Sequence, residues 1–484
     1  MRPAAPVTTT RGRWSLSEGT PRPYERRHTG AVVSASPQPS PTRAGRRRVH
    51  PAWGVAAVAF VALVGAAGFR AAPGVLMVPL HDELGWSTSL MSLAVSLNLV
   101  LFGLTAPFAA ALMERFGMRR VVACALLLIA AGAALSSRAQ AAWQLLPTWG
   151  LLIGLGTGSM ALVFAATVAD RWFVRRRGLV IGVLTAGSAT GQLSLLPVVA
   201  WASDALGWRT AVLVVAAAAL AVVPLVLLFL RDRPLDLGVL PYGAQPAADG
   251  PLSPLEQASP RVAPERAPAA RGAAAARAVR ALREASRRPA FWALAGAFAI
   301  CGATTNGLVG VHFVPSAHDH GMATTTAAGL LAVVGVFDIA GTIASGYLTD
   351  RFDPRLLLLA YYAFRGVGLL VLPWLLGPAV HPSMLLFVVV YGLDWVATVP
   401  PTAVLCRELF GSAGTVVFGW VFASHQVGAA VAAGVAGVLR EQTGTYTAAW
   451  VGGAALCAVA AVLSVSLRRA PRPEGVSASS SSPA

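Results

Sequence analysis

Five ionisable side chains interrupt long apolar stretches of the sequence, and they are the residues best suited to chemistry. They are Arg70, Asp338, Arg365, Asp394 and His425. An ionisable side chain near the centre of a bilayer costs roughly 2.5–3.5 kcal/mol even on lenient insertion scales, so each is a functional candidate. A guanidinium binds a carboxylate through two parallel hydrogen bonds, whereas a carboxylic acid or an imidazole exchanges protons. The set therefore predicts anion binding combined with proton exchange.

Each of these residues also has a structural interpretation. Arg70 is either an anion anchor or a side chain that reaches out to lipid headgroups. Asp394 is either a proton carrier or the partner of Arg365 in a buried ion pair, because an unpaired buried charge is very costly. Arg365 can equally compensate Asp338. His425 is either a proton relay or a neutral, hydrogen-bonded packing residue.

Other polar groups in the apolar stretches are weaker candidates. Asn98, Gln192, Asn306 and His312 can contact a polar substrate or bond a neighbouring helix. The short run His318-Asp319-His320 offers at most three ligands from one loop, too little support for a metal site. No Ser/His/Asp or Cys/His arrangement has a soluble pocket around it. We therefore predict no metal, no cofactor and no enzymatic activity.

The elements that position these residues are membrane-spanning helices. The chain has 484 residues, of which 56% are hydrophobic and only 12% are charged. Its mean hydropathy is +0.64, too apolar for an ordinary soluble protein. Since a helix needs about 20 apolar residues to cross a bilayer, we predict an all-α integral membrane protein with twelve spans. The predicted spans are 52–77, 87–112, 120–138, 143–168, 178–202, 210–230, 290–315, 323–348, 355–377, 383–405, 413–438 and 446–467.

Basic residues are distributed unequally between the loops, and all 38 of them are arginine. The short loops of one side, which we call the basic face, contain ten: Arg115, Arg119, Arg120, Arg171, Arg175, Arg176, Arg177, Arg351, Arg355 and Arg407. The short loops of the opposite face contain three: Arg138, Arg209 and Arg440. The positive-inside rule predicts that the basic face and both termini are cytoplasmic. The net charge of +17 then reflects topology, which argues against nucleic acid as a partner.

The predicted spans form two sets of six. The expected boundaries are a disordered cytoplasmic tail at 1–50, a first six-helix bundle at 51–232, a central cytoplasmic loop at 233–289, a second bundle at 290–468 and a disordered cytoplasmic tail at 469–484. In the central loop, arginines between residues 271 and 288 recur near helical spacing. This spacing fits either a basic helix on the membrane surface or a flexible tether.

A short polar island occurs once in each half. The copies are Gly346-Tyr-Leu-Thr-Asp-Arg-Phe-Asp-Pro-Arg355 and Ala110-Ala-Leu-Met-Glu-Arg-Phe-Gly-Met-Arg-Arg120. Each has a small residue, three further residues, an acid-Arg-Phe step and then more arginines. Two copies in matching surroundings indicate an internal repeat, and therefore two related halves.

Twelve spans as six plus six, with this island after the second span of each half, resemble the major facilitator superfamily. The resemblance implies two bundles that alternate access to a site between them. It also implies gating and structural roles for six residues: Glu114, Arg115, Arg119, Asp350, Arg351 and Arg355. Carboxylate–guanidinium bonds at a helix end can form in one state and open in the other. The alternative is that these charges only set topology. The first copy departs from the usual pattern with Ala110 for Gly and Glu114 for Asp.

A second match is narrower. Residues Trp172–Gly182, followed by Ala186–Gly191, resemble the fifth-helix signature of the monocarboxylate porter family, and Arg231-Asp232-Arg233-Pro234 is similar to that family as well. The resemblance implies transport of small carboxylates, commonly with a proton. It also implies an anion-binding role for Arg70, since the family has a basic residue in its first helix.

The eighth span departs from that family. The family shows an acid with an arginine four residues later, whereas here Asp338 is followed by Thr342. Arg365, at similar depth in the next span, is the candidate for the missing charge.

These features predict a secondary active transporter of the inner or plasma membrane that moves a small, monocarboxylate-like organic anion together with a proton. Arg70 is the predicted anchor and Asp394 or Asp338 the proton carrier. The expected partners are the anion, protons and the bilayer, and the protein is expected to be monomeric. Because the chain has no lysine, a Walker-type ATP site is excluded and a gradient must supply the energy. The alternatives are a proton-driven exporter of amphipathic compounds and a transporter-like membrane sensor.

Overall fold

The structure is a computed structural model that describes residues 50–160, 162–244 and 273–467, most of which are helical. All of them belong to one unit, His50–Ala484. Within the described residues, β structure is limited to an isolated bridge between Phe173 and Tyr242. The predicted all-α class is therefore confirmed.

The first six spans lie close to their predicted positions. Five are single helices: α1 (Pro51–Leu84), α2 (Thr88–Phe116), α3 (Met118–Ser136), α6 (Arg177–Leu206) and α7 (Trp208–Phe229). The fourth span is composite and consists of the 3-10 turn η1 (Ala142–Gln144), the π-helix η2 (Leu146–Ile153), α4 (Gly154–Ser159) and α5 (Leu162–Trp172). A 3-10 turn, η3 (Pro234–Leu237), follows α7.

The second six spans are preceded by the basic helix α9 (Ala273–Ala285). Four are single helices: α12 (Thr324–Thr349), α13 (Pro354–Leu375), α16 (Gly414–Thr443) and α17 (Thr447–Ser466). The seventh span consists of α10 (Pro289–Gly302), the π-helix η5 (Ala303–Val309) and α11 (Gly310–Asp319). The tenth consists of α14 (Pro382–Asp394) and α15 (Val399–Phe410), and the short turn η6 (Gly411–Ala413) leads into α16.

The helix lengths fit twelve crossings of a bilayer. Ten described segments are long and apolar enough to cross on their own. One of them, Pro382–Thr443, is 62 residues long and holds both the tenth and the eleventh span. The remaining span is α6, a 30-residue helix of which Leu195–Leu206 counts as a shorter apolar segment.

The helix ends follow local sequence rules. Gly85 ends α1 with φ of +64°, a conformation that glycine adopts without penalty. Ser87 then caps α2, since its side chain accepts a hydrogen bond from the backbone N–H of Leu90. Proline stands in the first turn of α10, α13 and α14, where a missing N–H costs nothing.

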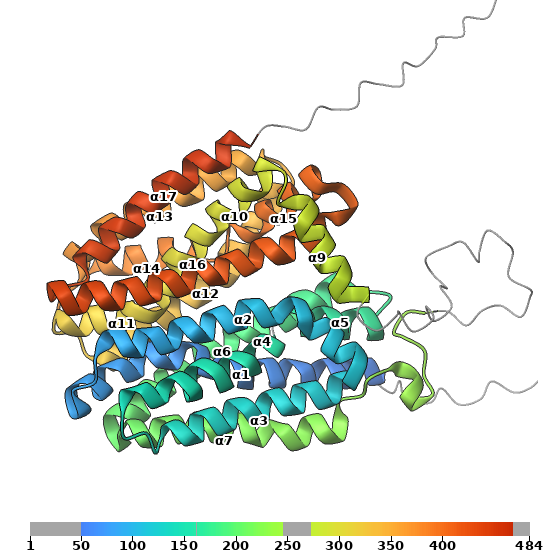
Figure 1. Ribbon diagram of the computed structural model, residues 1–484, viewed down its shortest axis with the longest axis horizontal. Helices are drawn as coiled ribbons and strands as arrows, with labels where there is room; N and C mark the ends of the chain where they lie inside the picture. Colours follow the sequence, from blue (N-terminus) through green and yellow to red (C-terminus); the bar gives the residue numbers. More distant parts are fainter. Residues whose placement is uncertain (1–49, 161, 245–272, 468–484) are drawn as a thin grey trace, which may run out of the picture. The chain divides into compact units, whose positions relative to one another are not determined.

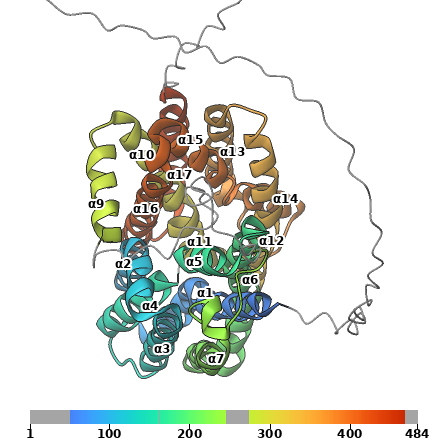
Figure 2. The ribbon, with the colours of Figure 1, turned by 90° about the vertical axis from the view of Figure 1, so that its right-hand side faces the viewer.

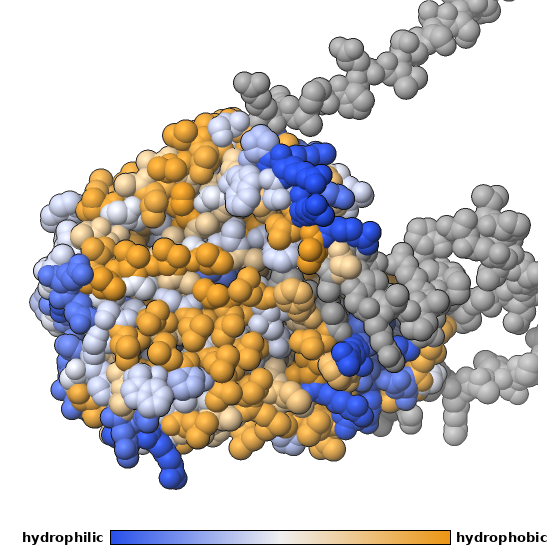
Figure 3. Space-filling view, viewed as in Figure 1, coloured by the Kyte–Doolittle hydropathy of each residue, from blue (hydrophilic) through white to orange (hydrophobic). Residues whose placement is uncertain are grey.

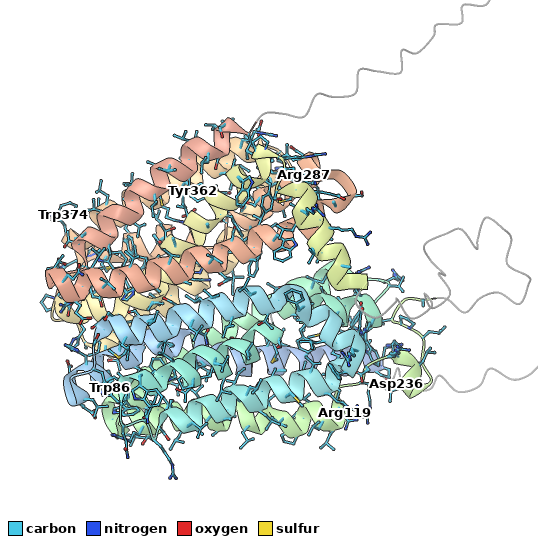
Figure 4. The ribbon with its side chains drawn as sticks, in the orientation of Figure 1. Trp86, Arg119, Asp236, Arg287, Tyr362 and Trp374 are labelled. Atoms are coloured by element: carbon cyan, nitrogen blue, oxygen red, sulfur yellow. The ribbon has the colours of Figure 1, made fainter. Side chains whose placement is uncertain are left out.

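The helices of the two halves form two groups, which lie below and above each other in Figure 1 and are seen end-on in Figure 2. Hydrophobic residues cover the middle of the described surface in Figure 3, and hydrophilic residues gather at its two ends. Arg119 and Arg287 mark the basic face at one end, whereas Trp86 and Trp374 lie at the other end (Figure 4). An apolar belt between polar ends is the surface that a bilayer requires.

The two groups pack through small residues. A Cβ on Gly74 of α1 would lie 2.9 Å from the carbonyl oxygen of Val311 in α11, so only glycine allows this approach. A Cβ on Gly437 of α16 would lie 2.4 Å from Ser92 Oγ in α2. Ser96 Oγ of α2 donates to the carbonyl oxygen of Ala430 at 2.7 Å. Small residues thus hold α1 and α2 close to α11 and α16.

Candidate functional site

The tenth span is interrupted between Asp394, where α14 ends, and Val399, where α15 begins. Pro400 and Pro401 cause the break, because proline has no N–H to bond the carbonyl four residues earlier. The carbonyl of Val396 instead accepts from the N–H of Val399 at 2.9 Å. A helix interrupted at membrane depth leaves backbone groups that other parts of the protein must satisfy.

Arg365 of α13 satisfies the end of α14. Its Nε lies 2.6 Å from Asp394 Oδ2, and its Nη2 donates to the carbonyl oxygens of Asp394 at 2.6 Å and of Trp395 at 3.3 Å. Its Nη1 lies 3.0 Å from the sulfur of Cys301 in α10. Arg365 is only 1% exposed, so these contacts are shielded from bulk solvent. The predicted Arg365–Asp394 ion pair is therefore present in the structure.

Asp338 of α12 binds the other side of the break. Its Oδ1 accepts from the backbone N–H of Val396 at 3.1 Å and from Thr342 Oγ1 at 3.2 Å. Thr342, at the position where the resemblance places an arginine, thus serves as a neutral donor to Asp338. Ser345, two turns along the same helix, donates to the carbonyl oxygen of Ala397 at 2.5 Å.

Asp338, Arg365 and Asp394, which we call the ionic cluster, meet at consecutive backbone groups of the break. With both carboxylates ionised, the cluster has one positive and two negative charges. In addition, Asp394 Oδ1 is buried and has no hydrogen-bond partner among the described residues. A buried charged oxygen without a donor is costly, and a proton bound to one carboxylate would make the cluster neutral. The arrangement is suited to binding one proton.

A chain of contacts links the ionic cluster to the seventh span. Tyr391 of α14 donates its hydroxyl proton to the carbonyl oxygen of Thr304 at 2.8 Å. Thr304 lies in the π-helix η5, two residues before Asn306. Tyr362, labelled in Figure 4, lies one helical turn before Arg365 and donates to the carbonyl oxygen of Ala297 at 2.7 Å. These two hydrogen bonds join α13 and α14 to the seventh span, at α10 and at η5.

A small cavity of about 30 Å³ lies where the two bundles meet. Its lining comes from α1, α2 and η2 of the first half and from η5 and α11 of the second: Phe69, Pro73, Val95, Asn98, Leu99, Phe102, Trp149, Asn306, Gly310 and Val311. A cavity of this volume has room for about one water. Two of its walls are π-helical turns, which occur frequently at functional sites. This cavity is the candidate substrate site.

Two of the predicted polar contacts, Asn98 and Asn306, line this cavity. Asn98 also donates from Nδ2 to the carbonyl oxygen of Trp149 at 2.7 Å, so it joins two helices as well. Arg70 and Gln192 belong to α1 and α6, but their side chains lie outside the described residues. His425 is buried outside this lining, with its ring stacked on Phe422 at a centroid distance of 5.8 Å.

Arg355 is the most strongly bound of the six predicted gating residues. It begins α13 and is 8% exposed. Its side chain donates to the carbonyl oxygen of Leu467 at 2.8 Å and pairs with Asp353 at 3.3 Å and with Glu408 at 3.4 Å. Arg355 thus ties the start of α13 to the ends of α15 and α17.

The remaining charges of the two islands are mostly exposed. Glu114 and Asp350 form no ion pair within the described residues, and both are exposed. Arg115 is exposed as well, while Arg351 lies over the ring of Tyr347 at 3.7 Å. In this state the two acids are therefore available for pairing.

The first island is held by a residue from the far end of its bundle. Gly117 precedes α3 and has no side chain to cap it, with φ of +85°. Asp232, which follows α7, accepts from the backbone N–H of Arg119 at 2.9 Å. Arg171 at the end of α5 donates to the carbonyl oxygen of Asp232 at 3.4 Å. Asp232 therefore joins the ends of the third, fourth and sixth spans, a role that its sequence signature did not reveal.

Residues 58–418 match the description "Major Facilitator Superfamily", which covers most of the chain. The chain belongs to this superfamily, as the resemblance predicted. It is a multi-pass membrane protein with the fold of a transporter.

Within the superfamily, the chain is similar to monocarboxylate transporters. It is 29% identical to monocarboxylate transporter 11 of Mus musculus over 82% of this chain and 83% of that one. It is 30% identical to monocarboxylate transporter 12-B of Danio rerio over 71% and 72% of the two chains. It is also 25% identical to the uncharacterised transporter YcxA of Bacillus subtilis, over 81% and 90%.

Solved structures show the same fold. A bacterial homologue of the human lysosomal transporter Spinster, in an inward-facing and unoccupied conformation, has a TM-score of 0.60 at 15% identity, covering 88% of this chain and 100% of that one. The xylose transporter XylE from E. coli, in a partially occluded inward-open conformation, has a TM-score of 0.61 at 13% identity, covering 86% and 98%.

Proposed function

We propose that this protein moves a small organic anion of the monocarboxylate type together with a proton, by alternating access between its two bundles. The observation that carries the proposal is the ionic cluster at the break of the tenth span, in which Asp394 Oδ1 is buried without a hydrogen-bond partner among the described residues. The similarity to monocarboxylate transporters supports the substrate class. In transporters of many folds, interrupted helices form the sites for substrates and coupling ions.

The proton acts through the contacts of Arg365. While Asp394 is ionised, it binds Arg365 Nε at 2.6 Å, and the same guanidinium holds the carbonyls that end α14. Protonation of Asp394 weakens this pair, because the Coulomb attraction is lost in a site without water. The hinge between α14 and α15 is then held less tightly. Asp338, bound to Val396 on the other side of the hinge, is the second residue that can accept the proton.

The anion site is the central cavity, which in this state has room for about one water and must widen to admit a carboxylate. Asn98 and Asn306 provide amide groups from opposite bundles. Arg70 follows Phe69 of the cavity lining in the chain, and we assign to it the charge that binds the carboxylate. Substrate between the bundles couples them, since each bundle supplies part of its contacts.

We assign the structure to the inward-facing state. Among the described residues, the hydrogen bonds that join the two bundles all come from the first half of α2, at Ser87, Ser89 and Ser96, on the side of the opposite face. On the basic face, Glu114 and Asp350 are exposed and free of ion pairs within the described residues. We propose that they pair when the basic face closes, and that this face is cytoplasmic in the cell membrane. The described contacts require no second copy, and we propose a monomer.

The test is proton flux into liposomes that hold the purified protein and a trapped pH dye, with mono- and dicarboxylates added outside in turn. Internal acidification with one acid, absent in protein-free liposomes and in Arg70→Ala, would support anion–proton symport. Asp394→Asn should abolish proton-driven accumulation and leave substrate exchange measurable. Glu83→Gln, an exposed acid on the opposite face, is the matched control and should behave as the parent. Unchanged accumulation in Asp394→Asn would remove Asp394 from the mechanism.

The cavity lining favours one alternative, a proton-driven exporter of amphipathic compounds. Phe69, Phe102 and Trp149 give the cavity aromatic walls, and its described lining residues include no charged side chain. Such walls suit an apolar ligand body. In that case protons would move in the direction opposite to the substrate, and Arg70→Ala would have little effect on transport. An absent response across the acid panel, followed by proton release with hydrophobic compounds, would favour the exporter.

A further inference from the structure

The helix α9 precedes the seventh span but does not itself cross the membrane. It is strongly amphipathic. Arg280 and Arg283 of α9, and Arg287 two residues after its end, are exposed and follow one another at spacings of three and four residues, so they share one face, which the exposed Glu284 also shares. These three arginines form no hydrogen bond or ion pair with the described residues. The other face is apolar: Ala285 is 2% exposed and belongs to a buried cluster against which Leu282 packs.

The protein holds α9 in place from both bundles. Trp420 of α16 donates its indole N–H to the carbonyl oxygen of Ala278 at 2.9 Å. Arg288, just after α9, donates to the carbonyl oxygen of Leu409 at 3.0 Å, and its guanidinium lies 5.7 Å from the ring centroid of Phe410. The helix also contacts α2 of the first bundle. These contacts fix which side of α9 faces outward.

The outward side of α9 lies at the level of the membrane boundary. The seventh span begins at Pro289, two residues after Arg287. Trp292, in its first turn, is 62% exposed and donates its indole N–H to the carbonyl oxygen of Ser286 at 2.8 Å. An exposed tryptophan at the start of a span marks the headgroup layer. In the end-on view of Figure 2, α9 lies at the edge of the helices beside α2 and α16, and strongly hydrophilic residues cover its position in Figure 3.

We propose that α9 is a binding site for anionic phospholipid headgroups of the leaflet on the basic face. Arg280, Arg283 and Arg287 supply the charge, and Trp292 and the apolar face set the depth. Three exposed cations without partners among the described residues, held at headgroup level, match the negative phosphates of that leaflet. Because α9 contacts α2 of the first bundle and α16 of the second, a bound lipid would touch a helix that contacts both bundles. The site does not depend on which substrate is transported.

The experiment measures lipid binding directly on the full chain. Purified protein in a neutral detergent is titrated with phosphatidylglycerol or phosphatidylcholine, and bound lipids are counted by native mass spectrometry. We expect saturable binding of phosphatidylglycerol and about fivefold weaker binding for each arginine removed. The triple variant Arg280→Gln/Arg283→Gln/Arg287→Gln should therefore bind about one hundredfold more weakly.

The matched control is the triple variant Arg120→Gln/Arg175→Gln/Arg407→Gln, which removes three exposed arginines from the same face outside α9. It should keep the parent affinity. A lysine triple at positions 280, 283 and 287 should also bind, since an ammonium supplies the same charge. The thermal midpoint in detergent without lipid shows that each variant is folded.

Several results would overturn the site. Equal binding of the two lipids would show that charge is not recognised. Equal losses in both glutamine triples would show a general surface effect. Displacement of phosphatidylglycerol by equimolar inorganic phosphate would indicate a soluble phosphate ligand, and capture of nucleic acid by the α9 arginines in preference to lipid would indicate a different partner.

Discussion

The two copies of the repeated island cap the helix that follows them in different ways. In the second copy, Asp353 accepts from the backbone N–H of Arg355 at 2.9 Å, within one loop. In the first copy that position is Gly117, and Asp232 accepts from the N–H of Arg119 at the same distance, across 113 residues. The cap contact has the same length in both copies. Its acceptor is a neighbouring residue in the second copy and a residue distant in sequence in the first. A repeat therefore preserves the requirement of a cap more strictly than the residue that meets it.

The interiors of the two bundles differ more. The second bundle contains the ionic cluster, whereas the buried polar residues described in the first bundle are uncharged Ser, Thr and Asn side chains. Buried charges cost free energy wherever they occur. Their concentration in one bundle therefore indicates that the two bundles have different functional roles. In our proposal the second bundle binds the proton, and the first bundle provides most of the cavity wall.

The largest expected effect comes from breaking the ionic cluster. Arg365→Leu leaves Asp394 and two carbonyl groups without their donor, which should destabilise the protein by about 3–5 kcal/mol. The double variant Arg365→Leu/Asp394→Leu should recover part of that loss, because the carboxylate of Asp394 is no longer left without a cation. Thermal unfolding in a mild detergent measures both. A single variant as stable as the parent would show that the pair contributes nothing to folding.

An intermediate effect is expected from the two caps. Asp232→Ala and Asp353→Ala should each cost about 1 kcal/mol, the usual loss for a removed N-cap. The double variant should show the sum, because the two sites share no partner. Unfolding midpoints of the three variants give the comparison. If Asp353→Ala alone were destabilising, the contact of Asp232 with Arg119 would not be a working cap.

The smallest expected effect concerns the contact between the bundles on the opposite face. The carboxylate of Glu441 accepts from Ser87 Oγ at 2.8 Å and from the backbone N–H of Ser89 at 3.2 Å. Glu441→Ala should shift the population toward the state open on that face by no more than about fivefold, since exposed polar contacts contribute below about 1 kcal/mol. Spin-label distances between the ends of α2 and α16 report the shift. Glu83→Ala is the control. An unchanged distance distribution in Glu441→Ala would show that the contact of Glu441 with Ser87 and Ser89 does not hold the opposite face closed.

Much of the fold was predictable from the sequence because a bilayer imposes long apolar helices. The predicted spans 120–138 and 323–348 became α3 and α12, within two residues at either end. The break in the tenth span followed from Pro400 and Pro401, whose missing N–H groups are visible in any sequence. The Arg365–Asp394 pair was one of two stated alternatives, and electrostatics alone required some partner for Arg365.

Other features had no sequence signal. The π-helices η2 and η5 contain Pro147, Gly150 and Gly307, which are poor α-helix formers, but no residue in either segment specifies the wider π-turn. The contact of Cys301 with Arg365 depends on how three spans pack. The cap by Asp232 joins distant segments, and only the folded chain brings them together.

The two π-helices beside the cavity have a mechanical consequence. A π-turn contains one residue more than an α-turn, so each segment is a store of one residue of helix length. Converting η5 to an α-helix would rotate the chain beyond it by about 100° and advance it by about 1.5 Å. The cavity-lining residues just beyond η5, Gly310 and Val311, would then shift without any unfolding of the span. On both sides of its central cavity, the transporter therefore has a helix segment whose conversion to an α-helix would shift the chain by a single residue.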